Sequence, residues 1–296
     1  MTDDTNESTP RTAADMVELA KKATFLFEPG TSGTYSSGGY AVLARVLELA
    51  SGQDYSTLVR ERVFAKLDLA HTSNPTAGEI LPGRAPSYVP GLRGIENAPP
   101  KDLTFLVGAG SVFSNARDLH TLTRAVVEGK MGEGPRQSFV RSGKLNWNGS
   151  TNGYRAFADY DSATGVAVAF CGNVHSGAND LMRQAIPAIV KGEAPPPTNL
   201  PAIALDPRAG RARVPEATLK GYEGVYQLGN GTRLDVRARD GVLAANEWIL
   251  VPMSDSTFFS LRDYGEVRPV PGPDKRIERL DWKVGSDVWP APRVAN

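Results

Sequence analysis

Apolar residues recur every three or four positions in several stretches of the first 190 residues, which is the spacing of one helical face. The clearest stretch is residues 41–50, where Ser51-Gly52 supplies a stop signal. A further helix is expected to begin at Ser114 as its N-cap and to run through Val126. The same spacing predicts three more helices, over residues 15–23, 56–65 and 179–190.

Residues 153–160 and 165–172 have the pattern of two strands, joined by the polar turn at residues 161–164. Residues 72–102 differ, because they are rich in Pro, Gly, Asn and Ser and contain no sustained period. A loop of this length inside a compact domain is usually functional. We therefore expect residues 72–102 to shape a pocket.

The composition changes after residue 192, which predicts two domains. Residues 193–215 form a linker that starts with a stiff, Pro-rich segment. Beyond it, short alternating runs are separated by Gly, Asp and Pro, and Asp240-Gly241 is a tight-turn signal. We predict a main domain over residues 1–192 and a small antiparallel β-barrel-like domain over residues 216–296.

Charge and composition exclude several partners. The 33 basic residues balance the 33 acidic ones, so no net field favours nucleic acid or an anionic membrane. No run of about 18 apolar residues predicts a membrane span, and the polar residues 1–8 lack a signal-peptide pattern. The three histidines are far apart, so neither a metal site nor a cofactor is expected. Cys171 lies in an apolar run and is expected to be a small buried hydrophobe.

Several short motifs occur in an order and spacing that resemble a known family. They are Phe27–Gly30 with Tyr35–Leu43, then Leu67–Leu69 with Thr72, and Gly108–Ser114 with Asp118-Leu119. Together they resemble serine β-lactamases, penicillin-binding proteins and related esterases and D-aminopeptidases over roughly residues 15–190. The resemblance implies a mixed α/β (α+β) fold, an antiparallel sheet flanked by helices. It also implies hydrolysis of a small-molecule amide or ester through an acyl-enzyme.

The resemblance assigns a role to Tyr35. In the family, a Tyr-x-Asn element supplies a tyrosine that helps to move protons and an asparagine that binds the substrate amide. Tyr35 matches the tyrosine, whereas Ser37 stands where asparagine is usual. The structural alternative makes Tyr35 a buried aromatic with a hydrogen-bonded hydroxyl and Ser37 a helix N-cap.

The third family signature, a Lys-Thr-Gly or His-x-Gly sequence on a strand edge, is best matched by Trp147-Asn148-Gly149-Ser150. By this resemblance, Gly149 lets the substrate approach the backbone and the Ser150 N–H forms half of an oxyanion hole. Such a donor lowers a reaction barrier by about 2.7–4 kcal/mol. Trp147 replaces the usual cation or imidazole. The alternative is a plain β-turn with a packing tryptophan.

The first family signature, Ser-x-x-Lys, is absent from the sequence. No lysine has Ser or Thr three positions before it, and Ser142 lies only two positions before Lys144. In the family this motif precedes the region that matches residues 15–40, so we expect the chain to begin after it. Its loss would leave apolar surface and a strand edge uncovered. Four serines in turns are the alternative nucleophiles, namely Ser36, Ser37, Ser111 and Ser114.

Two functional hypotheses remain open. In the first, the chain is a serine hydrolase whose nucleophile comes from a complementing N-terminal segment. The alternative partner is a second copy of the chain, in a homo-oligomer. In the second, the chain is a non-catalytic binding or interaction module derived from that fold. Removal of the nucleophile costs about 10⁶ in kcat in a well-studied serine protease, so we expect this chain alone to be nearly inert. The resemblance implies a periplasmic or exported setting.

Overall fold

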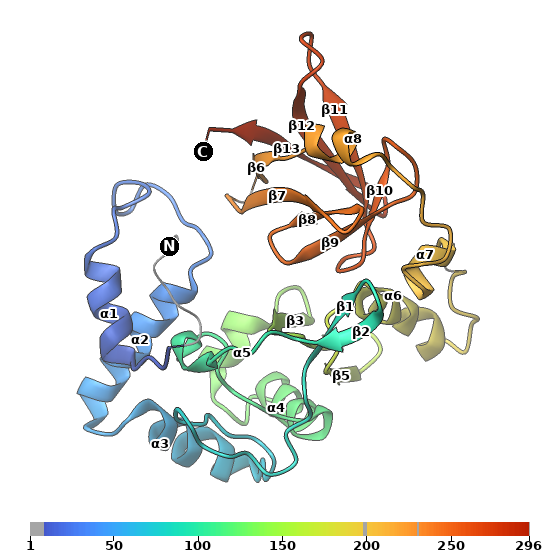
Figure 1. Cartoon of the computed structure of the whole chain (residues 1–296). Helices are drawn as coiled ribbons and strands as arrows, with labels where there is room; N and C mark the ends of the chain where they lie inside the picture. The colour runs from blue at the N-terminus through green and yellow to red at the C-terminus, as the bar shows by residue number, and fades with distance from the viewer. Residues whose placement is uncertain (1–8, 198–199, 230, 296) are drawn as a thin grey trace. The chain divides into compact units, whose positions relative to one another are not determined.

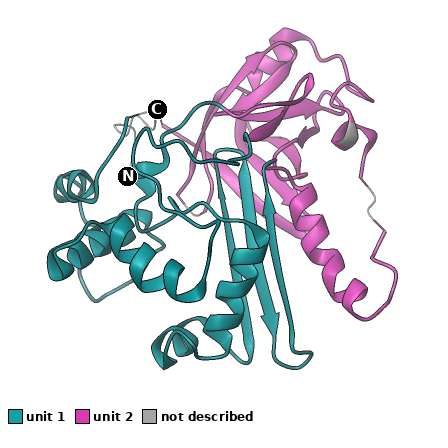
Figure 2. Cartoon of the chain, turned by 90° about the horizontal axis from the view of Figure 1, so that it is seen from below, with its two compact units in different colours: residues 1–86, 99–173 teal, residues 87–98, 174–296 magenta. Residues whose placement is uncertain are grey.

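The computed structural model describes residues 9–197, 200–229 and 231–295 (Figure 1). The polar start at residues 1–8, part of the Pro-rich segment (residues 198–199), Asn230 and Asn296 lie outside the described residues. The chain forms two compact units, shown in different colours in Figure 2. We call residues 1–86 and 99–173 the sheet unit, and residues 87–98 and 174–296 the barrel unit. The predicted domain limits at residues 192 and 216 stay predictions.

The sheet unit begins with two packed helices. Thr12 caps the first helix, and the second is capped by Ser36, whose Oγ accepts a hydrogen bond from Gly39 N at 3.0 Å. Gly52 ends the second helix in the left-handed conformation (φ 69°), as the stop signal predicts. The helical elements of this unit are α1 (Ala13–Lys21), α2 (Ser37–Ser51), α3 (Tyr55–Val59), η1 (Arg60–Phe64), η2 (Ala65–Leu67), η3 (Leu103–Leu106), α4 (Ala116–Val127) and α5 (Glu133–Phe139).

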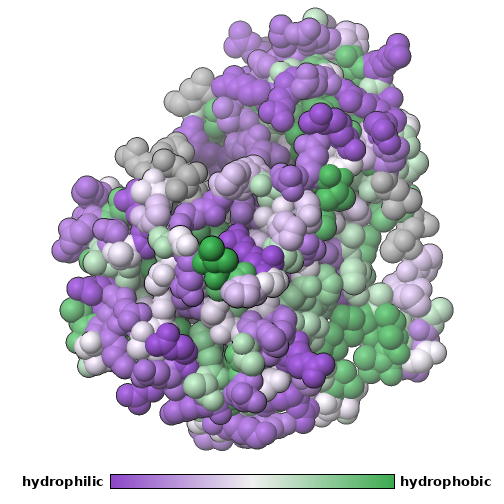
Figure 3. Space-filling view, turned by 60° about the horizontal axis from the view of Figure 1, so that its bottom comes forward, coloured by the Kyte–Doolittle hydropathy of each residue, from purple (hydrophilic) through white to green (hydrophobic). Residues whose placement is uncertain are grey.

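Helix α2 buries only its small residues. Ala41 and Ala44 pack with Met16 of α1 in one core cluster. The larger apolar side chains of α2 remain exposed, and hydrophobic groups reach the surface of the molecule in patches (Figure 3). The exposed side chains of α2 are Tyr40, Leu43, Val46, Leu47 and Leu49. An exposed apolar stripe of this kind is typical of a surface that binds another protein segment.

The sheet has three antiparallel strands in the order β3-β4-β5: β3 (Lys144–Thr151), β4 (Tyr154–Asp161) and β5 (Val166–Gly172). The two strands predicted from the sequence are thus β4 and β5. Helix α4 packs against both of them, and its Val126 and Val127 share a core cluster with Leu145 of β3. Among the described strands, β3 and β5 pair only with β4, so the outer edge of each is open.

The barrel unit contains a closed barrel, which the sequence predicts. Its described strands follow the order β10-β11-β12-β13-β6-β7-β8-β9, and the Asp240-Gly241 turn joins β7 to β8. Alternation along β7 places Leu234 and Val236 in the interior. The strands are β6 (Gly224–Gln227), β7 (Arg233–Arg239), β8 (Val242–Ala245), β9 (Trp248–Pro252), β10 (Phe258–Ser260), β11 (Glu266–Pro271), β12 (Ile277–Val284) and β13 (Asp287–Val294).

Three helices and a hairpin complete the barrel unit. The helices are α6 (Ala178–Val190), α7 (Ala202–Leu205) and α8 (Glu216–Gly221). The long loop predicted at residues 72–102 contains a hairpin, β1 (Tyr88–Gly91) with β2 (Gly94–Asn97), which the sequence pattern did not indicate. Pro90 and the glycines of so short a hairpin hide its alternation.

Three local predictions are wrong. Asn115 caps α4 in place of Ser114, because its side-chain oxygen accepts a hydrogen bond from Asp118 N at 2.8 Å. Ser37 is the first residue of α2, and the cap is Ser36. Cys171, the last residue but one of β5, is exposed.

Candidate active site

The strand that carries the third predicted motif, β3, is an edge strand. It turns into β4 through Asn152 and Gly153, whose φ angles are 41° and 82°. Two positive φ angles in a two-residue loop identify a type I′ turn. The residues that close such a hairpin, here Thr151 and Tyr154, exchange backbone hydrogen bonds with each other.

The N–H of Ser150 therefore points away from β4. Hydrogen-bonded and non-hydrogen-bonded pairs alternate along an antiparallel ladder, so Ser150 and Arg155 form a non-hydrogen-bonded pair. Lys144, six positions earlier and thus in the same orientation, donates its N–H to Arg141 O at 2.9 Å, outside the β3–β4 ladder. Among the described residues, the Ser150 N–H has no acceptor. It is a backbone donor at an open sheet edge.

The neighbours of Ser150 leave this edge accessible. Gly149 and Asn148 are exposed, and a Cβ added to Gly149 would meet no atom within 4 Å. Trp147 is half-buried and packs edge-on against Phe139 of α5, with 5.2 Å between the ring centroids. These residues lie inside a strand and do not form a β-turn. A small ligand can thus reach the backbone of Gly149 and Ser150 without displacing a side chain.

Tyr35 lies in the loop before α2, and its side chain is 85% exposed. The alternative of a buried, hydrogen-bonded tyrosine is therefore wrong. Ser37 begins the helix beside it. Among the described residues, no hydrogen bond or ring contact joins Tyr35 or Ser37 to β3. The structure brings Trp147–Ser150 together on one strand and leaves Tyr35 and Ser37 at the start of α2.

A cluster that the sequence analysis missed borders the turn between β3 and β4. The Tyr154 hydroxyl donates to Ala85 O at 2.7 Å and accepts a hydrogen bond from Arg84 Nε at 3.1 Å. The Arg84 guanidinium also lies 4.7 Å from the centre of the Phe113 ring, which contacts Tyr154 edge-on. These contacts fix part of the long loop beside Ser150. The Asn152-Gly153 pair, a strong hairpin signal, could have located this region.

The alternative nucleophiles have structural partners. Ser111 is buried and donates to Asn74 Oδ1, and the Ser114 hydroxyl bonds to Thr72 at 2.8 Å. Thr72 in turn donates to the buried Asp118 carboxylate at 2.8 Å. No histidine or lysine bonds to these serines or to Ser36 among the described residues. The hydrogen bonds of Thr72 to Ser114 and Asp118 thus hold the segment at Thr72 to the start of α4.

Among the described residues, β3 thus provides a backbone donor at an open edge, and no histidine or lysine hydrogen-bonds to Ser36, Ser111 or Ser114. In the same part of the chain, no group of three or more His, Cys, Asp or Glu side chains could hold a metal ion. None of its helices is long and apolar enough to cross a membrane.

The comparisons with known proteins agree with the fold. The chain is 27% identical over 99 residues to the putative penicillin-binding protein PbpX of Bacillus subtilis (strain 168), which is 33% of this chain and 25% of that protein. The match thus spans about a quarter of that relative's length. The D-amino acid amidase from Ochrobactrum anthropi SV3 complexed with L-phenylalanine shares the fold, with a TM-score of 0.55 and 19% identity over 62% of this chain and 66% of that one.

The crystal structure of SurE matches 99% of this chain and 75% of its own chain, with a TM-score of 0.54 and 18% identity. At these identities the likeness to solved structures concerns the fold alone. A family model described as Beta-lactamase matches residues 1–191, which is more than half of the chain and includes every element of the sheet unit. The chain belongs to the Beta-lactamase family.

Proposed function

We propose that the sheet unit is the part of a serine hydrolase that binds the substrate carbonyl, in an enzyme that cleaves small amides or esters through an acyl-enzyme. The observation that carries the proposal is the Ser150 N–H, a backbone donor that points to the open edge of β3 beside the unobstructed Gly149. A donor of this kind stabilises the oxyanion that forms when a carbonyl is attacked. Esters, β-lactams and amides of D-amino acids are the substrate classes that the family match favours.

The reaction needs a serine that the 296 residues do not provide as a Ser-x-x-Lys motif. A segment outside these residues, in the same polypeptide or in a partner chain, supplies that motif. The serine Oγ bonds to the carbonyl carbon and its proton passes to the lysine. The carbonyl oxygen, now negative, accepts the Ser150 N–H. When the C–N or C–O bond breaks, the leaving group takes a proton relayed by Tyr35. Water then cleaves the acyl-enzyme to the free acid and the serine.

The complementing segment would cover the surfaces that the sheet unit exposes. The apolar stripe of α2, from Tyr40 to Leu49, and the open edge of β5 are both suited to bind a further helix and strand. A homo-oligomer could cover the same surfaces but would bring no Ser-x-x-Lys, because every copy lacks it. The proposal therefore favours a different segment over a second copy. A setting in the cell envelope fits the penicillin-binding relatives.

The second candidate function is a binding module that retains the carbonyl site without catalysis. The absence of Ser-x-x-Lys from the sequence favours it. The two functions differ in one outcome, which is turnover when the upstream sequence is present.

The test compares purified residues 1–296 with a version extended upstream, using a chromogenic β-lactam, a p-nitrophenyl ester and a D-phenylalanine anilide. We expect the short chain to be inactive and the extended chain to turn over at least one substrate. In the extended chain, Ser150→Pro removes the N–H without removing a bond between β3 and β4, and should lower kcat by about 10²–10³. Ser150→Ala keeps the N–H and should lose far less.

Two results would overturn the proposal. One is turnover by residues 1–296 alone that Tyr35→Phe abolishes, because the nucleophile would then lie in this chain. The other is an extended chain that remains inactive but still binds a substrate analogue, which is the result that the binding module predicts.

A further inference from the structure

The barrel has a pocket at one end whose lining is unusual in composition. Its volume is about 470 Å³, within the range of small-molecule sites. Three of the four tryptophans of the chain line it. The side chains that line it are those of Leu228, Trp248, Asp263, Trp282, Trp289 and Pro290.

The strand register explains how the indoles come together. Trp282 of β12 and Trp289 of β13 are direct cross-strand partners, so their side chains lie on the same face of the barrel wall. Trp282 is 1% exposed and belongs to the interior cluster, whereas Trp289 is 48% exposed. Trp248 contacts Trp282 edge-on, with 5.4 Å between ring centroids. The indoles therefore extend from the buried interior of the barrel to its mouth.

Asp263 adds a carboxylate to this aromatic lining. It lies in the turn between β10 and β11, where its Oδ2 accepts the Trp282 Nε1–H at 2.9 Å and its Oδ1 accepts Gly265 N–H at 3.0 Å. Both donors are neutral. Among the described residues, no lysine or arginine forms an ion pair with Asp263. The charge of this half-buried carboxylate is therefore not compensated by a basic side chain.

The nearest basic residue along the chain is already engaged. The Arg262 guanidinium lies 4.3 Å from the ring centre of Trp248, and its Nη1 is 3.9 Å from Glu247 Oε1. This contact also illustrates how an indole of this group attracts a cation.

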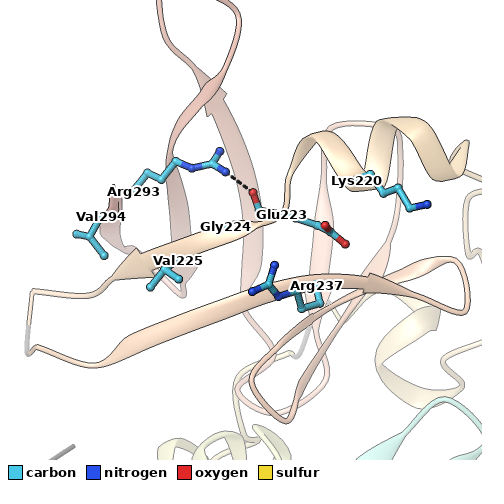
Figure 4. A pocket seen from close by; sticks show the side chains of 7 residues that line it. All are labelled: Lys220, Glu223, Gly224, Val225, Arg237, Arg293 and Val294. Carbon is cyan, nitrogen blue, oxygen red and sulfur yellow. Dashed lines mark hydrogen bonds between the residues drawn. The ribbon is translucent and has the colours of Figure 1, made fainter. Parts of the chain in front are cut away.

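Another pocket of the barrel unit, of about 490 Å³, carries no proposal (Figure 4). It is lined by Lys220, Arg237 and Arg293, but each cation has a partner. Lys220 pairs with Glu216 at 2.8 Å, Arg237 pairs with Asp235 at 2.9 Å, and Arg293 donates to the Glu223 carbonyl oxygen. The carboxylate of Glu223, which also lines this pocket, offsets the charge that Arg293 retains, so there is no excess positive charge to bind an anion.

We propose that the tryptophan pocket at the mouth of the barrel binds an organic ammonium ion that carries an apolar group. The indoles supply apolar contact and π faces that attract a cation, and Asp263 supplies the opposite charge. An anion is disfavoured by Asp263. A neutral apolar molecule would use the indoles but gain nothing from the carboxylate. The proposal does not depend on the hydrolase function, because the barrel unit provides every residue of the pocket.

Tryptophan fluorescence of the full chain tests the proposal directly. In a Trp147→Phe background, only the three pocket indoles emit. We expect saturable changes on titration with benzylamine and with benzyltrimethylammonium, and weaker responses to benzyl alcohol and benzoate. Asp263→Asn retains an acceptor for Trp282 but removes the charge, and should weaken binding of the cations about tenfold. Trp289→Ala should weaken it as well, and Trp289→Phe should restore most of it.

A matched control separates the pocket charge from the net charge of the chain. Asp235→Asn removes an exposed carboxylate of β7 that pairs with Arg237, and should leave binding unchanged. Far-UV circular dichroism identifies any variant that does not fold. If Trp289→Ala does not fold, the affinity of Trp289→Phe for the cations is compared with that of the unaltered pocket instead. Equal affinities for benzylamine and benzyl alcohol, or no effect of Asp263→Asn in a folded protein, would overturn the proposal. So would a lack of saturation with both cations.

Discussion

The sheet unit and the barrel unit differ in whether the outer strands of their main sheets are paired. In the closed barrel each of the eight described strands has a neighbour on each side, and Phe258 and Leu280 are completely buried in the interior. In the sheet unit β3 and β5 each have an open edge, and α2 exposes its larger apolar side chains. Closure removes the edges through which sheets bind other chains, whereas open edges invite a partner. We infer that the barrel unit is self-sufficient in packing and the sheet unit is not.

The same contrast applies to their chemistry. The candidate site of the sheet unit is a backbone donor on an open edge, Ser150 N–H, and in the proposed hydrolase a further segment supplies the nucleophile. The pocket of the barrel unit is formed by side chains held by a closed wall, with Asp263 bonded to Trp282. An open edge can be completed by a partner, whereas a closed barrel can bind a ligand without one.

The largest effect should come from a core deletion in the barrel. Phe258→Ala removes a fully buried ring and should lower the free energy of unfolding by about 3–5 kcal/mol. Tyr40→Ala on α2 removes a ring that is 53% exposed and should change it by no more than about 0.5 kcal/mol. Urea unfolding followed by circular dichroism measures both. Equal losses would contradict the inference that the apolar stripe of α2 is uncovered.

Amide hydrogen exchange sharpens the comparison without a mutation. The β3–β4 alternation extends through β4, so the N–H groups of Ala167, Ala169 and Cys171 point to the open edge of β5. They should exchange at least about 10³-fold faster than the amides of Leu280 and Trp282, which open only with the whole barrel. Mass spectrometry or NMR can measure the rates. Protection of the β5 amides at the level of the barrel would show that this edge is covered.

Much of the fold could be predicted because its signals are local. Gly52 ends α2 and Asp240-Gly241 joins two strands, and each acts through its own backbone conformation. Strand β3 is identified only by family resemblance, because the alternation of Leu145 and Trp147 with polar residues stops at Gly149 and is therefore short. The edge of a sheet needs no apolar cover, so its strands carry a weak pattern.

The sites depend on contacts that the sequence does not reveal. The orientation of Ser150 N–H follows from the type I′ turn at Asn152-Gly153, a local signal that fixes the hydrogen-bonded pairs of the hairpin. The tryptophan pocket follows from the order in which the barrel closes, which brings Trp248 beside Trp282 although 34 positions separate them (282 − 248). Pairing between distant strands cannot be deduced from periodicity within each one.

The smallest expected effect is on the pH dependence of the free energy of unfolding. The contributions of Asp263 in the barrel unit and Asp15 in the sheet unit should change with pH in opposite directions. Burial raises the pKa of Asp263 above its ordinary 3.8, against the opposing hydrogen bonds from Gly265 and Trp282. The folded barrel therefore retains a proton that the unfolded chain has lost, and its stability falls as the pH rises from 3.8 through the higher folded pKa.

In α1, the hydrogen bond from the Thr12 backbone N–H lowers the pKa of Asp15 below 3.8, helped by the Thr12 side chain. That contribution is complete above 3.8 and is lost as the pH falls through the folded pKa. Free energies of unfolding should be measured from acid to neutral pH. Asp263→Asn should reduce the loss of stability at rising pH, and Asp15→Asn should reduce the loss of stability at falling pH. If Asp263→Asn instead steepened the loss of stability at rising pH, the carboxylate would be stabilised by a cation in the folded chain. The ammonium site would then already be filled by the protein itself.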